Sequence, residues 1–532
     1  MHILVIAGPA GKSDPGLAIT KRYRYDNRVT DTAEIDVLVV GAGPTGLTLA
    51  CALRLHGLSV RVIDRADGPA TTSRANFLHA RGSEVLGRIG ALGTLPEESL
   101  RAMRITNYLG GKPLMTLEFG DPGLGTAAPP MVVSQARVEA ALRGRLSELG
   151  PLPEWGRALV GVRQDAAGVL AQVAGGESVR ARWVVGCDGT SSTTRQLADI
   201  DFPGVKLSER FLLADLRLDW DVDRAGTSGW IHPDGVLGVM PMPDPAGGDD
   251  LWRVFAYDPG LDQKPTEDEI FDRIQAVLPQ RTGRDVRVSD PQWLSVFTVH
   301  RRLAQTYRRG RILIAGDAAH AHSPFGGQGM LTGIGDAENL AFKLALVARG
   351  LAAETLIDTY ESERRPLAAD VLRGTSAVTR VNIASNPVGR FLRDCVAPRI
   401  FGIAAVQRWT TYTASQLWVS YRKGPLGGRG PKPCRGDRIA DLDCVRADGT
   451  ETRLHRELGG RWVLLLPDGT PPGEQLATAR GRLGDFVTGL TYQGADTMLI
   501  RPDGHLGWRG SPDTAEGLNR WLDEALGTGN AR

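Results

Sequence analysis

The hydrophobic pattern near the start of the chain predicts a strand–helix–strand unit. Residues 35–40 form a near-continuous apolar run, which is typical of a strand buried on both faces of a parallel sheet. Apolar residues at helical spacing follow over 47–53 and predict a helix that ends near Gly57. A second apolar run, 60–63, ends in Asp64. The whole unit has the length of about 30 residues expected of a βαβ motif.

The pattern then changes twice before residue 300. From about 70 to 150 it predicts helix and irregular structure, including a helix over 135–149, and residues 150–186 resemble short strands. Between 201 and 300 apolar and polar residues alternate, which predicts an antiparallel sheet with one helix, 266–278, against it. The strands expected there are 211–220, 230–242 and 251–257.

The last part of the chain returns to the style of the first. A buried-strand run at 311–316 precedes a long amphipathic helix that includes 334–347. The Gly/Pro-rich segment 423–433 predicts a linker. Beyond it we expect a compact αβ unit with a hairpin whose turn is Pro502-Asp503-Gly504.

These patterns predict an α/β fold with an interrupted first domain. We expect a Rossmann-type dinucleotide-binding domain over 34–200 and 290–422, interleaved with a mostly antiparallel sheet domain over 201–289. A C-terminal domain over 434–532 follows, and residues 1–33 form an N-terminal extension.

Composition narrows the class of protein. The 532 residues carry 63 Lys plus Arg and 61 Asp plus Glu, a balance that argues against a nucleic-acid binder. No segment reaches the ~18–20 apolar residues that span a bilayer, and the N-terminus lacks the basic start of a signal peptide. The five cysteines are scattered and form no CxxC pair, which is typical of a reducing compartment. We therefore expect a cytoplasmic protein with no nucleic-acid and no membrane partner.

The first chemical motif is the turn Gly41-Ala-Gly43-Pro-Thr-Gly46 between the first strand and its helix. Gly41 permits the tight turn, Gly43 lets the backbone approach a pyrophosphate, and Gly46 lets helix and strand pack closely. Free N–H groups at the helix start favour phosphate, and Asp64 can accept a hydrogen bond from a ribose. The unit predicts a dinucleotide but does not choose between FAD and NAD.

Two later motifs make that choice through a resemblance. One is Gly-Cys-Asp-Gly at 186–189, and the other is Gly-Asp-Ala-Ala-His at 316–320, followed by Pro324 and Gly-Gln-Gly at 327–329. In this order the three motifs resemble the group A flavoprotein monooxygenases, the p-hydroxybenzoate hydroxylase-like aromatic hydroxylases. Segments 415–422, 436–441 and 499–509 are similar to signatures of the aromatic polyketide and phenol hydroxylases that carry a thioredoxin-like C-terminal domain. The resemblance covers roughly residues 34–532. Because the C-terminal domain lacks a CxxC pair, the resemblance implies that this domain has a packing or interface role.

The resemblance implies a set of FAD contacts. Gly41, Gly43, Thr45 and Gly46 would hold the pyrophosphate and Asp64 the adenosine ribose. The other implied contacts are Arg65 and Arg74 on the adenosine and pyrophosphate side, Gln135 on the flavin, Asp188 in a loop shared with NADPH, and Asp317 on the ribityl chain.

The resemblance also implies how the flavin head is held. A helix that starts at Gly329, Met330 and Leu331 would point its N-terminus at the flavin N1–C2=O edge and stabilise the negative charge of the reduced flavin. The backbone carbonyl of Pro324 would lie near the oxygen-reactive C4a atom. The family usually has Asn where this chain has Leu331, so one side-chain contact to the ring is missing.

The implied reaction is hydroxylation of a small aromatic substrate, polyketide-type or phenolic, with O2 and NADPH or NADH, through a flavin C4a-hydroperoxide. No side-chain acid or base is assigned, and the oligomeric state expected is monomer or homodimer. Two alternatives stay open: Baeyer–Villiger oxygenation of a polyketide ketone, and a flavin-binding protein with impaired catalysis, prompted by Leu331. His320-Ala-His322 lacks the further ligands of a metal site, so no metal is expected.

Overall fold

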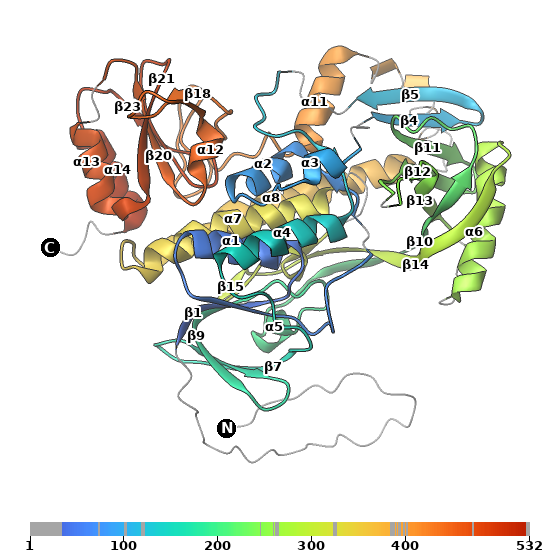
Figure 1. The fold of residues 1–532 in the computed structure, drawn as a ribbon, viewed down its shortest axis with the longest axis horizontal. Helices are drawn as coiled ribbons and strands as arrows, with labels where there is room; N and C mark the ends of the chain where they lie inside the picture. Colours follow the sequence, from blue (N-terminus) through green and yellow to red (C-terminus); the bar gives the residue numbers. More distant parts are fainter. Residues whose placement is uncertain are drawn as a thin grey trace.

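The computed structural model describes residues 34–72, 75–100, 104–118, 123–244, 246–258, 260, 265–322, 327–382, 389, 391, 395–396, 399–400, 403–470 and 473–527. Three sheets organise these residues. In Figure 1 a central mixed sheet with a parallel core lies below a layer of helices, a large mixed sheet lies to one side, and a small C-terminal domain lies to the other. The α/β fold class expected from the sequence is confirmed.

The central sheet brings three distant segments together. β1 (Ile35–Val40) pairs in parallel with β2 (Val60–Ile63) and with β9 (Ser178–Gly186), and β9 pairs in parallel with β16 (Ile312–Ile314). Because parallel strands end at the same edge, the three chemical motifs that follow β1, β9 and β16 meet there. The other strands of this sheet are β7 (Leu159–Gln164), β8 (Val169–Val173) and β15 (Arg308–Arg309).

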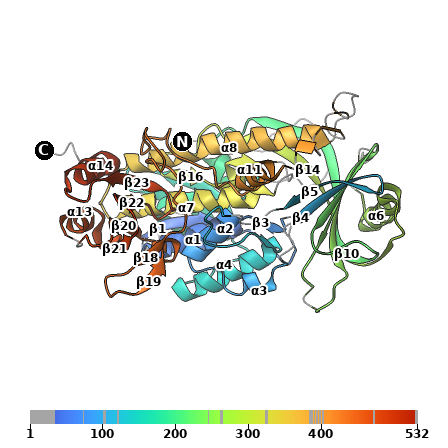
Figure 2. The same cartoon turned by 90° about the horizontal axis from the view of Figure 1, so that it is seen from above.

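Helix α7 (Gln328–Ala348) is the central helix of this part. It packs against α1 (Pro44–Leu55), α2 (Ala80–Arg88) and α8 (Thr355–Asn382), and Figure 2 shows it running lengthwise between them. Most of its side chains are buried, including Lys343. The remaining helices near the central sheet are α3 (Leu95–Glu98), α4 (Gln135–Leu149), α5 (Thr193–Leu197) and the short 3-10 turn η1 (Gly316–Ala318).

The second sheet takes strands from outside the range expected for it. Its order is β17-β14-β10-β13-β12-β11-β4-β5, and all its neighbours are antiparallel except β11 and β4. The expectation of helix and irregular structure over 70–150 was wrong for two segments, because residues 104–109 and 112–118 form a hairpin around Gly110-Gly111. The strands are β4 (Arg104–Leu109), β5 (Lys112–Glu118), β10 (Gly204–Asp219), β11 (Thr227–His232), β12 (Gly235–Pro241), β13 (Leu251–Tyr257), β14 (Arg287–Leu303) and β17 (His320–Ala321).

A second correction concerns residues 230–242, which were expected as one strand. They form parts of β11 and β12, which pair with each other across Pro233-Asp234. Proline cannot donate to a ladder and Asp-Gly favours a turn, so the alternation continues on a returning strand. Helix α6 (Glu267–Thr282) covers one face of the sheet, with a Thr266 and Glu269 capping box at its start. A separate two-stranded sheet pairs β3 (Phe77–Leu78) with β6 (Met131–Val132).

The C-terminal domain has its own six-stranded sheet in the order β19-β18-β21-β20-β22-β23. β20 and β21 are parallel and are linked through α13, whereas β22 and β23 form the hairpin expected around Pro502-Asp503-Gly504. One of its hydrophobic clusters includes residues of α7, and the rings of Phe342 and Trp462 meet edge-on at 5.6 Å. The elements are β18 (Asp443–Val445), β19 (Glu451–Arg453), α12 (Leu454–Leu458), β20 (Trp462–Pro467), α13 (Glu474–Leu483), η3 (Gly484–Phe486), β21 (Val487–Tyr492), β22 (Thr497–Ile500), β23 (Leu506–Gly510) and α14 (Glu516–Leu526), preceded by α11 (Ala404–Ala414).

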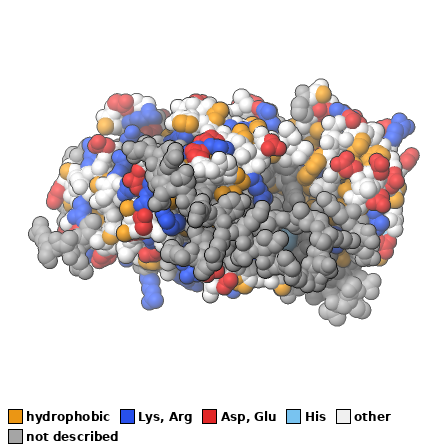
Figure 3. All heavy atoms as spheres, turned by 90° about the horizontal axis from the view of Figure 1, so that it is seen from below, with side chains coloured by type: hydrophobic (Ala, Val, Ile, Leu, Met, Phe, Trp, Pro, Cys, Tyr) orange, Lys and Arg blue, Asp and Glu red, His pale blue; other side chains and the backbone are white. Residues whose placement is uncertain are grey.

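One face of the molecule shows mixed charge over its described residues. On the face drawn in Figure 3, Lys and Arg side chains alternate with Asp and Glu side chains over the coloured residues. Among the described residues, none of the helices combines the length and hydropathy needed to cross a bilayer.

Candidate functional site

The glycine turn after β1 has the close backbone contacts that its sequence predicts. A Cβ atom added at Gly46 would lie 1.9 Å from the carbonyl oxygen of Gly41, and one added at Gly41 would lie 2.4 Å from the carbonyl oxygen of Cys187. A Cβ added at Gly43, in contrast, meets no atom within 4 Å. The turn is therefore closed against the protein on two sides and open beside Gly43, where α1 begins with Pro44 at its first turn.

Asp64 lies at the end of β2, directly beside this turn. Its Oδ2 accepts a hydrogen bond from the backbone N–H of Ala42 at 2.7 Å, and its Oδ1 accepts one from Ala66 at 2.8 Å. Each carboxylate oxygen keeps a second lone pair for a ligand hydroxyl. Arg65 follows on the exposed side of the same loop.

Gln135 begins α4 and is linked to a buried carboxyl group. Its Nε2 donates to Oε1 of Glu139 at 2.9 Å, and its backbone N–H donates to the carbonyl of Ala75. Burial raises the pKa of Glu139, and the nearby charge of Asp64 raises it further. Glu139 was not singled out in the sequence, although it lies four residues after Gln135 on the same helix face.

The carboxylate of Asp188 is used inside its own loop. It accepts hydrogen bonds from the Thr194 backbone N–H at 2.9 Å, from the Thr194 hydroxyl at 3.0 Å and from the Ser192 hydroxyl. These bonds fix the start of α5. Buried Arg195 donates to the carbonyls of Ala318 and Thr190, both at 2.9 Å, and so joins this loop to the motif after β16. Asp188 therefore shapes this loop, and the role toward FAD and NADPH implied for it stays a prediction.

The motif after β16 packs against the glycine turn through Thr45. A Cβ added at Gly316 would lie 2.5 Å from the Thr45 Oγ1, and one added at Gly333 would lie 2.2 Å from it. The Thr45 side chain therefore fills the space between this motif and α7. Asp317 is exposed on η1, next to this packed position.

The first turn of α7 is open at Gly329 with respect to the described residues. Its N-cap, Gly327, has a left-handed backbone with φ of +62°, and a Cβ added at Gly329 meets no described atom within 4 Å. Met330 is partly buried against the central core. Leu331 is 1% exposed, and its Cδ1 lies 3.4 Å from a Cβ added at Gly82 on α2. The side chain that replaces the family's usual Asn thus packs on the helix layer.

Three expectations lie outside the described residues and stay predictions. These are the roles of Arg74 and Pro324 and the N-terminal extension over 1–33.

Two histidines, His320 (buried) and His322 (partly buried), lie beside the same motif, and the sequence suggested for them only the metal-ligand role that it did not support. His320 Nε2 lies 2.6 Å from Oδ2 of Asp336 on α7, and the rings of His320 and His322 are 4.7 Å apart. Burial lowers the pKa of His322 far below its usual range, and the neighbouring His320 adds to this. Within the described part of the chain, no cluster of three or more His, Cys, Asp or Glu side chains has metal-site geometry.

The large sheet carries a buried ion pair on the face opposite α6. Arg253 makes two 2.6 Å contacts with Asp215, donates to Oδ1 of Asn76 at 2.7 Å, and lies over the ring of Trp293. Neighbouring residues on these strands pack on α6, so the pair lies on the opposite face. Met240 packs there with Val132 of β6.

Comparison with known families decides what the arrangement is. The model of the FAD binding domain matches residues 34–375, and that of the aromatic-ring hydroxylase C-terminal domain matches residues 432–529. The chain belongs to the FAD-dependent aromatic-ring hydroxylases. It is accordingly a flavoprotein monooxygenase with FAD as its cofactor.

Individual relatives extend over nearly the whole chain. The 12-dehydrotetracycline 5-monooxygenase/anhydrotetracycline 6-monooxygenase of Streptomyces rimosus subsp. rimosus is 36% identical, with 92% of this chain and 98% of that protein covered. The crystal structure of an aromatic hydroxylase from angucycline biosynthesis matches with a TM-score of 0.76 and 31% identity, covering 93% of this chain and 99% of the other. The dialkyldecalin synthase of Streptomyces rugosporus is 32% identical and covers 92% of this chain and 99% of its own. The first two names do not favour the Baeyer–Villiger alternative.

The described residues fit FAD. The space beside Gly43 and the space beside Gly329 are both open, and the backbone N–H groups at the starts of α1 and α7 border them. Helix N-termini favour negative charge. A diphosphate therefore suits the position beside Gly43, and a ring edge that carries negative charge suits the position beside Gly329.

Proposed function

We propose that this monooxygenase hydroxylates an electron-rich ring of a fused-ring, polyketide-type aromatic compound. One oxygen atom of O2 enters the C–H bond of the ring, and the other is reduced to water by the two electrons of NADPH or NADH. The observation that carries this proposal is the full-length similarity to a monooxygenase named for tetracycline precursors, which includes the C-terminal domain.

The proposed roles of the chain follow from the geometry above. Backbone N–H groups of Gly43, Thr45 and Gly46 would hold the diphosphate of FAD, and Asp64 would accept a hydrogen bond from the ribose. Asp317 would bind the ribityl chain. The bound FAD supplies the redox chemistry, accepting a hydride and delivering oxygen.

The start of α7 would contribute electrostatics. Its unpaired N–H groups carry about half a positive charge, which would stabilise the negative charge that a flavin gains on reduction. This contribution comes from the backbone at Gly329 and Met330, so it does not need the Asn that Leu331 replaces. Gln135, Arg65, Arg74 and the Pro324 carbonyl are proposed to complete the contacts.

Turnover with labelled oxygen tests the proposal. The purified protein, loaded with FAD, is mixed with NADPH or NADH, 18O2 and a panel of anthracycline-, angucycline- and tetracycline-type aromatics. We expect one substrate class to accelerate NAD(P)H oxidation and to yield a phenol that has gained one 18O atom. A lactone with 18O in its ring would instead establish Baeyer–Villiger oxygenation.

A second candidate, a flavin-binding protein without monooxygenase turnover, is motivated by Leu331 and by a relative named as a synthase. It predicts a yellow protein whose NAD(P)H oxidation responds to none of the aromatics and leaves no label in any product.

A further inference from the structure

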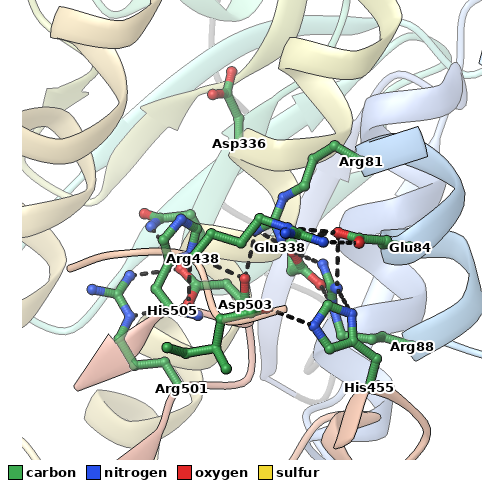
Figure 4. Close-up of polar contacts among 12 residues, drawn as sticks. Arg81, Glu84, Arg88, Asp336, Glu338, Arg438, His455, Arg501, Asp503 and His505 are labelled. Atoms are coloured by element: carbon green, nitrogen blue, oxygen red, sulfur yellow. Dashed lines mark hydrogen bonds and ion pairs between the residues drawn. The ribbon is translucent and has the colours of Figure 1, made fainter. Parts of the chain in front are cut away.

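The interface between the C-terminal domain and the helix layer is built from buried charges, which Figure 4 shows in close-up. Arg88 on α2 makes two contacts with Glu338 on α7, at 2.7 and 2.8 Å, and its Nη1 lies 3.0 Å from Nδ1 of His455 in the C-terminal domain. Arg438 pairs with Glu84 of α2. The side chains of Glu84, Arg88, Glu338 and His455 are buried, and that of Arg438 is 7% exposed.

Asp503, in the turn of the β22–β23 hairpin, lies at the centre of this interface. Its Oδ2 accepts hydrogen bonds from Arg501 at 2.6 Å and from Asn339 of α7 at 3.1 Å. Its backbone carbonyl accepts one from Arg81 of α2 at 2.6 Å. One residue of the C-terminal domain therefore contacts two helices of the FAD-binding part.

Glu363 on α8 continues the network. It receives two hydrogen bonds from Arg501, at 2.7 and 2.8 Å, and one each from Lys343 and Asn339 of α7, both at 2.7 Å. Burial alone would raise the pKa of Glu363, but Arg501 and Lys343 bring it down to about 2. The carboxylate is therefore charged and ties α8, α7 and the C-terminal domain together.

The next residue of α8 carries the contacts toward the flavin motif. Arg364 donates to Oδ1 of Asp336 at 2.7 Å and to the carbonyl of Thr332 at 2.8 Å, both on α7. It also donates to the Tyr421 hydroxyl at 2.9 Å, and the Tyr421 ring lies 4.2 Å from the ring of His505. His505 belongs to the same hairpin as Asp503.

Asp336 completes the path. Its Oδ2 accepts the backbone N–H of Gly316 at 3.0 Å and contacts Nε2 of His320 at 2.6 Å. Gly316 directly precedes Asp317, and Thr332 directly follows Leu331. A continuous set of buried contacts thus leads from the hairpin of the C-terminal domain to both segments that border the proposed flavin position.

We propose that Asp503 and His505 are positioning residues for FAD. The hairpin of the C-terminal domain fixes the positions of α8 and α7 relative to each other. Asp336 on α7 in turn fixes the position of the backbone at Gly316, to which it is hydrogen-bonded. This inference rests on the proposed placement of FAD, and it gives a tail without a cysteine pair a role in cofactor binding.

A purely structural tail makes a different prediction, namely that its variants lower stability and leave FAD affinity alone. Asp503→Asn separates the two roles, because it removes one charge with little change in shape. Glu457→Gln is the matched control, since Glu457 is a partly buried carboxylate whose partners, Arg446 and Thr452, lie within the C-terminal domain.

The experiment titrates FAD into the full-length apoprotein of each variant, at a temperature where circular dichroism shows it fully folded. We expect Asp503→Asn to raise the Kd for FAD at least tenfold and to alter the visible spectrum of the bound flavin. Glu457→Gln should change the Kd less than twofold, even where its Tm falls. Equal Kd values and spectra for wild type and Asp503→Asn would overturn the inference.

A milder variant keeps the test decisive if Asp503→Asn does not fold. Tyr421→Phe removes only the hydroxyl that Arg364 contacts and keeps the ring beside His505. It should raise the Kd for FAD about threefold or more, and an unchanged Kd would contradict the inference. A wild-type protein that takes up no FAD would overturn the proposed function as well, whereas unchanged variants of an FAD-binding wild type overturn this inference alone.

Discussion

The first turn of α7 and its middle turns are built in opposite ways. At the start, Gly327 and Gly329 contribute no side chains, and open space lies beside Gly329. In the middle, Asp336, Asn339 and Lys343 are fully buried and each has charged or polar partners on other elements. The first turn of α7 leaves space beside Gly329 that a ligand can occupy, whereas the middle turns are packed against other parts of the protein.

This difference distinguishes substitutions that affect FAD affinity alone from substitutions that also affect the stability of the apoprotein. Substitutions in the open regions should change FAD binding with little effect on the apoprotein. Substitutions in the charged region should lower the free energy of unfolding in addition to any effect on FAD affinity, because a buried charge that loses its partner is costly. Four predictions test this distinction.

Gly43→Leu should strongly lower the affinity for FAD. The backbone of Gly43 has φ of −77°, which any residue adopts, and a Cβ added there meets no atom of the described residues within 4 Å, so we expect the apoprotein to fold normally. The side chain would occupy the space proposed for the diphosphate. We expect a loss of affinity on the order of 100-fold, or about 2.7 kcal/mol, in a fluorescence titration. Gly481→Leu, at an equally open position on α13, is the control and should bind FAD like wild type.

Glu363→Gln should destabilise the fold strongly. The amide cannot balance the charges of Arg501 and Lys343, which are buried beside it. Breaking such a pair typically costs about 3–5 kcal/mol of unfolding free energy. Urea denaturation measures the change. Glu354→Gln removes a partner of Arg308 at the surface and should cost no more than about 1 kcal/mol, and equal losses for the two variants would contradict the contrast.

Leu331→Asn should lower stability without restoring a flavin contact. The Leu331 side chain is buried and lies beside Gly82 of α2, so we expect the amide to be buried against that helix. We expect the loss of apolar burial and the buried amide to cost about 2–3 kcal/mol. The Kd for FAD should stay within threefold of wild type. A clear gain in FAD affinity would show that position 331 faces the flavin.

Acidification should weaken the tail interface through its histidines. Burial lowers the pKa of His505 to about 4, with Asp503 partly opposing the shift. The unfolded chain takes up this proton below its ordinary pKa of about 6.5, but the folded chain does so only near pH 4. Stability is therefore full above about pH 6.5 and falls toward pH 4, by about 2 kcal/mol at pH 5 for this group.

His505→Gln should remove that share of the pH dependence. Urea midpoints at pH 7, 6 and 5 measure it, and parallel pH profiles for wild type and variant would contradict the assignment.

The contrast within α7 also explains how far the sequence could predict the molecule. The strand–helix–strand unit, the three motifs and the Pro502-Asp503-Gly504 turn are local patterns, and local backbone rules are enough to predict them. The partners of Asp336, Glu363 and Asp503 lie far apart in the chain, so their meeting depends on the packed fold. The burial of Lys343 could not be predicted, because its position in the helical pattern does not indicate that it packs against Glu363.

Two further differences have opposite causes. The hairpin around Gly110-Gly111 has a local cause, because its Gly-Gly turn lies between two short strands. Thr45 was expected only as a phosphate contact, and nothing in the motif shows that its side chain packs against Gly316 and Gly333.

The most direct test is a crystal structure of the FAD-bound protein. We predict that the diphosphate lies within hydrogen-bond distance of the backbone N–H groups at 43–46. We also predict that the N1–C2=O edge of the flavin ring lies at the start of α7. A protein that takes up no FAD, or a flavin bound away from both helix starts, would contradict these predictions.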